Sequence, residues 1–356
     1  MAFYPTTDTD RRVPHDALTD DITRLFGACG MADDDARLLA WSLVHADLRG
    51  IHSHGVLRVP DYVGKLTEQG VDPRGRPHVV VDSGAAIVVD CSNAMGQIGM
   101  AFAMNRAIER AADTHVAIAA VRGSNHCGAL DFFAMMALER DMIGICATNA
   151  LPTMAPWGGR DKIVGINPLG LAIPGGSEGP FVLDFAFGQT AHGKIRVYAQ
   201  KGLPIPEGWA FDAEGRPTTD ARAALEGLIQ PIGGHKGVAL GMAFGMLASL
   251  LSGGAYGTEL GNMVDGPTAG RDAHFCMAID PAAFVDIGTF KDRVDAILRQ
   301  VRTSRPAPGV DRLYTPGEIE VELEREYRAS GIPLNAETLA GIRQAAERLG
   351  VPLAVA

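Results

Sequence analysis

The sequence contains no G-x-G triplet, although it is rich in glycine. The G-x-G-x-x-G fingerprint of a Rossmann dinucleotide-binding turn is therefore missing. This absence argues against the usual dinucleotide-binding folds, but not against dinucleotide binding itself. The nearest match to a phosphate-binding P-loop is GQTAHGKI, residues 188–195. Ile195 stands where a P-loop carries the hydroxyl that holds Mg²⁺, so we do not expect a nucleoside triphosphatase.

The sequence also lacks any C-x-x-C pair. Its five cysteines are scattered, and one is left over from any pairing. This usage fits a reducing cytosol better than a disulfide framework, so we expect a cytoplasmic protein. Residues 1–16 are too polar for a signal peptide. The histidines and cysteines show no dense ligand spacing, so no metal site is expected.

Long apolar runs are scarce. Only residues 238–258 remain uncharged over about 20 residues, the length of a membrane span. Glycine and serine dilute this stretch, so we expect a buried helix and no contact with a membrane. A net charge of −10 argues against a general nucleic-acid binder. Internal repeats and low-complexity segments are missing as well.

The composition is otherwise that of a globular protein. The 356 residues suggest about two domains, and hydrophobic residues make up 47%. Glycine is unusual: 43 residues, about 12%, compared with roughly 7% in average proteins. An excess of glycine without low complexity indicates tight turns or backbone that closely approaches a ligand.

Hydrophobic periodicity predicts strands that alternate with helices, and therefore an α/β or mixed-sheet core. The predicted helices cover residues 17–29, 36–48, 62–69, 96–114, 130–139, 291–302, 316–329 and 336–349. A hairpin is predicted over 78–90, and further strands over 116–121, 142–147, 181–185 and 274–279. Residues 196–224 are rich in proline and glycine and are predicted to be an ordered loop.

Two histidine clusters are candidate sites. His54 lies in the sequence HSHG and is followed by Arg58 and Tyr62. Histidine exchanges protons near neutral pH, and arginine can clamp a carboxylate. The alternative is a surface loop with scattered polar groups. Ser124-Asn125-His126 follows a predicted strand, where α/β sheets tend to bind ligands.

Two further features favour a ligand site. Asp184 lies inside an apolar strand and needs a buried partner, for which a histidine is suitable. Gly233-Gly234-His235-Lys236-Gly237 opens the long uncharged helix. Glycine-rich backbone at a helix N-terminus, with one lysine, can bind an anion. The alternative is a flexible helix entry.

In their order along the chain, these segments resemble the malate/L-lactate dehydrogenase family. The resemblance covers nearly the whole chain and rests on these motifs: SHGVLRVPDY (53–62), GSNHCGAL (123–130), MAPWGG (154–159), GINPL (165–169), VLDFA (182–186), AHGK (191–194), IPEGWAFD (205–212), PTTD (217–220), GGHKG (233–237) and PGE (316–318).

The resemblance implies an NAD- or NADP-dependent oxidoreductase that interconverts a small 2-oxo acid and its 2-hydroxy acid. It also implies a non-Rossmann α/β fold, with a mixed sheet and with the helical N- and C-terminal segments packed together, in a homodimer. The expected division is a helical domain (1–77 plus 287–356), a small α/β segment (78–120) and a cofactor-binding domain (121–286).

Carried onto this sequence, the family pattern makes His54 the acid/base, with Ser53 and Asp184 orienting it and His126 as the second choice. Arg58 would hold the substrate carboxylate, and Asn125 and Tyr62 would line the pocket. The implied cofactor-binding residues are Asp184, Phe185, Ala186, Phe187, Gly188, Gln189, Thr190, His235, Lys236, Gly317 and Glu318.

Two other functions stay open at this point. One is a reductase of a cyclic imino acid, Δ1-piperideine- or pyrroline-2-carboxylate. The other is a dinucleotide-binding protein without catalysis. Cys127 and residues 130–133 depart from the family's usual pattern at the pocket wall, which leaves the exact substrate open.

Overall fold

The computed structural model describes residues 10–200, 202–260 and 270–355. Residues 1–9, which belong to the polar N-terminal segment, lie outside this part. A mixed seven-stranded sheet forms the centre, in the order β2-β3-β4-β13-β5-β8-β9. Its strands are β2 (His78–Ser83), β3 (Ala86–Asp90), β4 (Val116–Ser124), β13 (Asp272–Ile279), β5 (Ile143–Thr148), β8 (Leu169–Ile173) and β9 (Phe181–Phe185). Only β3 and β4 are parallel neighbours in this sheet.

Helices cover both faces of the central strands. On β13, Cys276 and Ala278 face one core with α4 (Gly96–Thr114) and α5 (Asp131–Met136). Phe275 and Met277 face the other core with α8 (His235–Leu250). The alternation follows from the two-residue period of a strand, and small apolar residues let both helix layers approach closely. The mixed α/β sheet expected from the sequence is therefore confirmed.

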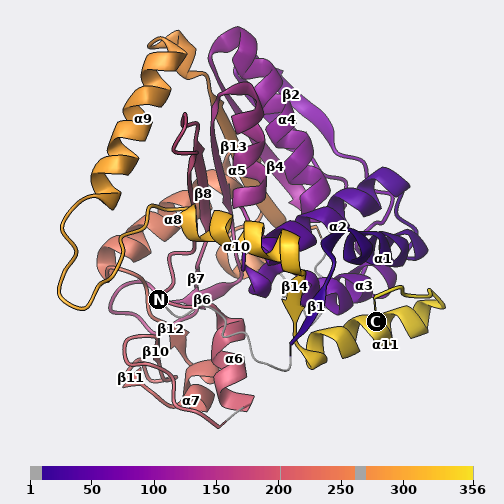
Figure 1. Ribbon diagram of the computed structural model, residues 1–356. Coiled ribbons are helices and arrows are strands. Elements are labelled where there is room, and N and C mark those ends of the chain that lie inside the picture. Colours follow the sequence, from indigo (N-terminus) through magenta and orange to yellow (C-terminus); the bar gives the residue numbers. More distant parts are fainter. Residues whose placement is uncertain (1–9, 201, 261–269, 356) are drawn as a thin grey trace.

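The two ends of the chain pack together, as expected. β1 (Arg11–Val13) pairs antiparallel with β14 (Ile332–Leu334). The N-terminal helices share one core with the C-terminal helix α11 (Figure 1, indigo and yellow). These helices are α1 (His15–Ala28), α2 (Asp33–Leu48), α3 (Val59–Thr67), α10 (Glu318–Ser330) and α11 (Ala336–Leu349).

The segment predicted as a loop contains helices, so that prediction was wrong in part. α6 (His192–Gln200) runs into it and α7 (Ala221–Glu226) ends it, with Asp220 capping α7. β10 (Ala210–Phe211), which lies between these helices, pairs with β11 (Pro217–Thr218) and with β12 (Leu228–Ile229), which follows α7. These elements are too short to produce a clear period, and they are held by a small core of their own around Ile195, Ile205 and Ile229. The short strands β6 (Pro152–Met154) and β7 (Val164–Gly165) lie beside it.

The long uncharged segment also differs from the prediction. α8 ends at Leu250, and it is buried on one side only. Its buried side carries Gly237, Gly241 and Gly245, whereas Leu240 and Leu250 are 50% and 59% exposed. A Cβ at Gly245 would lie 2.2 Å from Asn167 Nδ2, so glycine is needed for this close approach. None of the described helices has the length and apolarity to cross a bilayer.

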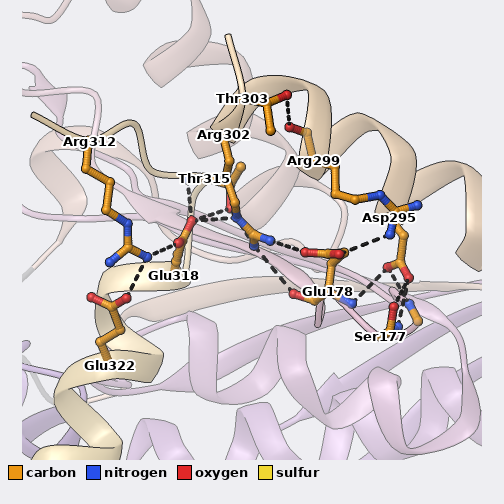
Figure 2. A network of polar contacts seen from close by, with 11 residues as sticks. Ser177, Glu178, Asp295, Arg299, Arg302, Thr303, Arg312, Thr315, Glu318 and Glu322 are labelled. Carbon is orange, nitrogen blue, oxygen red and sulfur yellow. Dashed lines mark hydrogen bonds and ion pairs between the residues drawn. The ribbon is translucent and has the colours of Figure 1, made fainter. Parts of the chain in front are cut away.

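α9 (Ile287–Arg302) stands apart at the upper left of Figure 1. Asp295 accepts hydrogen bonds from the backbone N–H groups of Gly176 and Ser177 at 2.9 and 2.8 Å. Glu178 pairs with Arg299 and Arg302, and Arg302 continues to Glu318 (Figure 2). In this network α9 is joined to the β8–β9 turn and to the start of α10. The division into 1–77 plus 287–356, 78–120 and 121–286 stays a prediction.

One glycine tests how tightly the sheet and α5 pack. A Cβ at Gly144 of β5 would lie 2.1 Å from the carbonyl oxygen of Ala134 in α5. Because backbone has to move, Gly144→Ala is expected to lower the free energy of unfolding by about 1–3 kcal/mol. Urea unfolding followed by circular dichroism measures this change.

The matched control is Gly27→Ala in α1, where a Cβ would have nothing within 4 Å. That variant should be stabilised by about 0.5–1 kcal/mol, because alanine favours a helix. Equal stability of the two variants would contradict the packing that we describe.

Candidate active site

A buried carboxylate fixes the turn that carries His54. Asp47, at the end of α2, accepts a hydrogen bond from the backbone N–H of Val56 at 2.7 Å. Its other oxygen lies 2.6 Å from His52 Nδ1. A Cβ at Gly55 would lie 2.2 Å from this carboxylate, so only glycine fits there. The two short 3₁₀ turns, His52–His54 and Val56–Arg58, are thereby held against α2.

The structure brings the two candidate acid/base histidines together. The rings of His54 and His126 stack with centroids 5.7 Å apart and planes 11° apart. Ser53 Oγ lies 2.9 Å from His54 Nδ1. Burial, and then the charge of Arg58, lower the pKa of His54 to about 4. Burial and the neighbouring His54 lower the pKa of His126 well below its usual value. Both rings are therefore neutral near pH 7.

Gln97 determines which nitrogen of His126 carries the proton. The wholly buried Gln97 donates from Nε2 to the hydroxyl of Tyr62 at 3.1 Å. The Tyr62 hydroxyl lies 2.7 Å from His126 Nδ1, and because this hydroxyl accepts from Gln97, we infer that it donates its own proton to that nitrogen. With Nδ1 accepting, the proton of His126 is on Nε2. The sequence reasoning missed Gln97, whose signal is a polar residue on the buried face of α4.

Asp184 is half-buried, whereas its position in an apolar strand predicted full burial. Its Oδ2 accepts hydrogen bonds from the backbone N–H groups of Leu130 and Asp131 at 2.7 and 3.0 Å. Burial, and then the charge of Asp131, raise the pKa of Asp184 to about 7. The partner of Asp131 is Arg49, with Nε 2.6 Å from Oδ2, and both side chains are 1% exposed. Asp184 thus orients the start of α5, and within the described residues it makes no hydrogen bond to Ser53 or His54.

Two residues expected to bind substrate are engaged with the protein. Arg58 donates from Nε to the carbonyl oxygen of Ser53 at 2.8 Å, and its Nη1 pairs with Asp61 at 3.1 Å. Asn125 donates to the carbonyl oxygens of Asn93 and Ala94, and accepts from the N–H of Gly270. The amide of Asn125 therefore holds its loop.

Two cavities meet at His54. The first, about 230 Å³, is lined by Ser53, Gly128–Asp131, Asp184–Ala186 and Arg49. The second, about 150 Å³, is lined by Asn125–Gly128, Thr148, Asn149, Lys65 and Asp272. Both are bordered by His54, Gly128, Ile166 and Pro168. Only these shared residues would separate a ligand bound in one cavity from a ligand bound in the other.

The segments predicted to bind the cofactor gather around β9. The N–H of Gln189 donates to the carbonyl oxygen of Gln230 at 2.7 Å, which brings the chain before His235 alongside. Gly317 approaches the same strand, since a Cβ there would lie 2.9 Å from Val182 Cβ. His235 and Lys236 are exposed at the first turn of α8. The apolar side chains and the glycine that line the first cavity suit a flat ring. The exposed start of α8 suits a phosphate.

Two of the residues predicted to bind the cofactor, Phe187 and Glu318, contact other parts of the protein instead. Phe187 is 1% exposed and stacks on Phe244 with ring centroids 5.7 Å apart, inside the core. Glu318 lies in the network of Figure 2, with Arg302 at 2.9 Å and Arg312 on the other side. Although burial opposes ionisation, hydrogen bonds from Thr315 and Arg302 lower the pKa of Glu318 to about 2.

The mixed α/β fold is that of solved dehydrogenase structures, with TM-scores of 0.90. The sequence pattern of the family described as malate/L-lactate dehydrogenase matches residues 13–343. The chain belongs to this family of NAD(P)-dependent 2-hydroxyacid dehydrogenases, as the resemblance implied.

Similar proteins carry names of this kind. The malate dehydrogenase of Pyrococcus horikoshii is 36% identical over 349 residues, which is 96% of each chain. The L-sulfolactate dehydrogenase of Methanocaldococcus jannaschii is 36% identical, and the match spans 93% of this chain and 94% of that protein. The solved structure of sulfolactate dehydrogenase from that organism superposes with a TM-score of 0.90 at 34% identity, over 96% of this chain and 98% of the other. A Δ1-pyrroline-2-carboxylate/Δ1-piperideine-2-carboxylate reductase of Pseudomonas putida is 35% identical over 72% of this chain and 75% of its own.

The Gln97–Tyr62–His126 chain gives a test of the site. In Tyr62→Phe, His126 loses the hydrogen bond that fixes its proton on Nε2. We expect kcat for 2-oxo acid reduction to fall about 10- to 100-fold, within the range for a positioned acid–base group. Cofactor affinity, followed by NADH or NADPH fluorescence, should stay within about twofold, because Tyr62 does not line the first cavity.

Tyr314→Phe is the matched control, since Tyr314 is exposed and its hydroxyl makes no hydrogen bond to any other described residue. Its kinetics should equal those of the wild type. An unchanged kcat in Tyr62→Phe would show that the tautomer of His126 is irrelevant to turnover.

Proposed function

We propose that this enzyme interconverts a small 2-oxo acid and its 2-hydroxy acid, with His54 as the proton donor and acceptor. The observation that carries this proposal is the position of His54 between the two cavities. The second cavity, of about 150 Å³, suits a substrate of a few heavy atoms. A general acid must reach the substrate carbonyl oxygen while the cofactor reaches the carbonyl carbon, and a substrate beside His54 would lie where the two cavities meet.

In the reducing direction, the substrate carbonyl lies in the second cavity between the two histidines. His54 Nε2 gives its proton to the carbonyl oxygen, and Ser53 supports the ring at Nδ1. His126 donates a hydrogen bond from Nε2–H to the same oxygen, which stabilises the developing negative charge. The residues that line the first cavity would hold the nicotinamide of NADH or NADPH, which would supply the hydride for the substrate carbon.

The residues proposed to hold the cofactor are those that border the first cavity or the start of α8. Asp184, Phe185 and Ala186 line the cavity directly, and Gly188–Thr190 continue from them. His235 and Lys236 offer a cation and a helix start to the phosphates. Gly317 supports β9 behind the cavity, while Glu318 holds the segment that contains Gly317 in place.

The low pKa of His54 has a direct consequence for the substrate. Arg58 disfavours the imidazolium form in the free enzyme. A carboxylate bound near Arg58 opposes this effect, so His54 takes up its proton together with the anionic substrate. Although Arg58 lines neither cavity, its Nη2 is not committed to Ser53 or Asp61, and we propose that this nitrogen holds the substrate carboxylate.

One observation favours a second candidate, the reduction of a cyclic imino acid. The carboxylate of Asp272 lines the second cavity, and a carboxylate attracts an iminium ion. The two candidates differ in the charge of the group that enters this cavity. A screen of NADH and NADPH with pyruvate, oxaloacetate, 3-sulfopyruvate and Δ1-piperideine-2-carboxylate separates them.

We propose further that the enzyme is a cytoplasmic homodimer. All five cysteines are free and buried, in keeping with a reducing compartment. The outer side of α8 exposes Leu240, Met246, Leu247 and Leu250, and the next residue, Leu251, is exposed as well. Contiguous apolar surface of this kind is typical of an interface between subunits.

The pKa of His54 predicts how the rate depends on pH. Reduction needs protonated His54, whose fraction falls tenfold per pH unit above a pKa of about 4. With pyruvate, kcat/KM should therefore fall by about tenfold per unit from about pH 5 to 8. Oxidation needs neutral His54, so kcat/KM for the hydroxy acid should stay level above about pH 5 and fall below about pH 4.

His54→Gln is expected to lose about 10²- to 10⁴-fold in turnover and to remove this dependence on pH. Cofactor affinity, measured by fluorescence titration, should survive because Gln is uncharged like the neutral ring. Turnover in His54→Gln equal to that of the wild type would refute the role of His54.

The dimer is tested by sedimentation velocity. Leu240→Glu combined with Leu250→Glu should convert the dimer to a monomer at micromolar concentration, because charges replace apolar contacts in the interface. Leu203→Glu changes an equally exposed leucine outside α8 and should leave the dimer intact. A monomeric wild type, or a dimeric double variant, would contradict the proposal.

A further inference from the structure

A third cavity, of about 720 Å³, lies beside the first turn of α8 and shares no lining residue with the other two. Its wall is mostly apolar and comes from the loop 155–159, from β10 and β12, and from α8. The charged residues that line it are Arg160, Asp161 and Glu214. Small-molecule sites typically have this size and this mixture of apolar wall and few polar groups.

Trp157 is the large aromatic side chain of this cavity. Residues 156–159 form a turn, in which the N–H of Gly159 donates to the carbonyl oxygen of Pro156 at 2.8 Å and Gly158 has a φ of +81°. Trp157 occupies the corner of this turn and is 61% exposed. Its ring meets the ring of His235 edge-on, with centroids 6.1 Å apart. An exposed indole at a cavity suits a purine, because aromatic side chains stack on the face of any base.

The charged groups of the third cavity differ in their partners. Glu214 pairs with Arg216 at 3.0 Å, and Arg216 also pairs with Asp212. Within the described residues, Arg160 makes neither a hydrogen bond nor an ion pair. A guanidinium group can bind a phosphate through two parallel hydrogen bonds. Arg160 is therefore available to a phosphate group in this cavity.

The third cavity lies close to the first. A Cβ at Gly188 would lie 2.7 Å from Ile166 Cγ2 and 2.9 Å from Ile229 Cγ2, so both side chains pack over the same glycine. Ile166 lines the first cavity, and Ile229 lines the third. Val238, in the first turn of α8, also lines the third cavity. This cavity thus adjoins the proposed site of the nicotinamide and the helix start proposed for the phosphates, where the other end of a dinucleotide has to lie.

We propose that the third cavity binds the adenosine end of the cofactor, with the purine stacked on Trp157 and a 2′-phosphate held by Arg160. The enzyme then prefers NADP(H) to NAD(H). This inference rests on the proposed function and specifies its cofactor.

Asp161 is the remaining charged group, and within the described residues it makes no hydrogen bond. In our proposal its carboxylate accepts a hydrogen bond from the exocyclic amino group of the purine. In the competing arrangement it accepts from the ribose hydroxyls, as acidic residues do in NAD-specific sites, and excludes a 2′-phosphate.

Arg160→Met provides the first test, with two nucleotides that lack the nicotinamide as probes. Isothermal titration calorimetry measures the Kd of adenosine 2′,5′-bisphosphate and of adenosine 5′-monophosphate. We expect the wild type to bind the bisphosphate about 10- to 100-fold more tightly, the usual effect of a hydrogen bond between charged groups. Arg160→Met should abolish this difference and leave the Kd of the monophosphate within about twofold. Arg160→Lys keeps the charge and should restore part of the difference.

Arg305→Met is the matched control, because Arg305 is exposed and lines none of the three cavities. It should leave both values of Kd unchanged. The unfolding midpoint is measured for each variant, and Arg160→Gln replaces Arg160→Met if the latter fails to fold. An unchanged ratio of the two values of Kd in a folded, uncharged variant would overturn the role of Arg160.

Trp157→Ala tests the position of the purine. Both nucleotides should bind about 5- to 100-fold more weakly, because a stacking surface is lost. Trp157→Phe keeps an aromatic ring and should retain most of the affinity. Reduced nicotinamide mononucleotide lacks the adenosine end, so its Kd should be the same in Trp157→Ala and in the wild type. Wild-type affinity of Trp157→Ala for both adenosine nucleotides would show that the purine lies elsewhere.

Asp161→Asn separates the two arrangements. In our proposal it weakens the binding of both adenosine nucleotides equally, so the ratio of their Kd values stays at its wild-type value. If Asp161→Asn instead strengthens the bisphosphate and weakens the monophosphate, Asp161 binds the ribose and our proposal is wrong.

The cofactor preference and the proposed function fail differently. A wild-type enzyme that reduces a 2-oxo acid with NADH at a kcat/KM equal to or above that with NADPH would overturn only the preference for NADP(H). A wild-type enzyme that reduces no 2-oxo acid with either cofactor would overturn the proposed function, and with it the cofactor on which this inference rests.

Discussion

The buried ion pair between Arg49 and Asp131 is the interaction on which the rest of the site depends. It joins the end of α2 to the start of α5, with both side chains 1% exposed. The N–H of the same Asp131 holds Asp184 in β9, and Arg49 also lies 3.5 Å from Glu324 in α10. Removing one partner of such a pair typically costs about 3–5 kcal/mol, because a buried charge is left unpaired. A single contact therefore positions helices from both ends of the chain against the sheet.

The same region of α2 fixes the reacting groups. Asp47 lies two residues before Arg49 and holds the turn that carries His54. Thus one face of α2 determines where the acid/base lies, and α5 determines where the first cavity begins. The second cavity is set from the other side, by α3 and by β13, which contribute Lys65 and Asp272. Acid–base catalysis depends on such distances, and here they are set by buried polar contacts between helices and the sheet.

The electrostatics of the site follow from burial. Both histidines are neutral in the free enzyme because the protein partly buries them and places positive charge beside them. In our proposal the substrate supplies the missing negative charge, so the proton and the substrate arrive together. An enzyme with a fully solvated histidine would lack this coupling, since its pKa would respond less to a nearby anion.

Much of the site could be predicted from the sequence. Ser53-His54-Gly55 and Ser124-Asn125-His126 lie in motifs of consecutive residues, and their meeting at one place follows from the family pattern. Gln97, Lys65 and Asp272 belong to no motif. They come from α4, α3 and β13, and only the folded chain places them beside His126. Conversely, Phe187 lies within a predicted cofactor segment, yet the structure packs it against Phe244. Proximity in sequence to a binding residue does not decide which way a side chain points.

The sequence by itself determined the class of the protein, the mixed α/β core and the two histidine motifs, because these depend on local residue patterns and periods. The tertiary structure alone decided the rest. It showed that the uncharged helix α8 is buried on one side only, that the proline-rich segment contains α6 and α7, and that His54 lies between two cavities. Burial, charge and hydrogen bonding between residues far apart in the chain set these properties, and no local pattern records them.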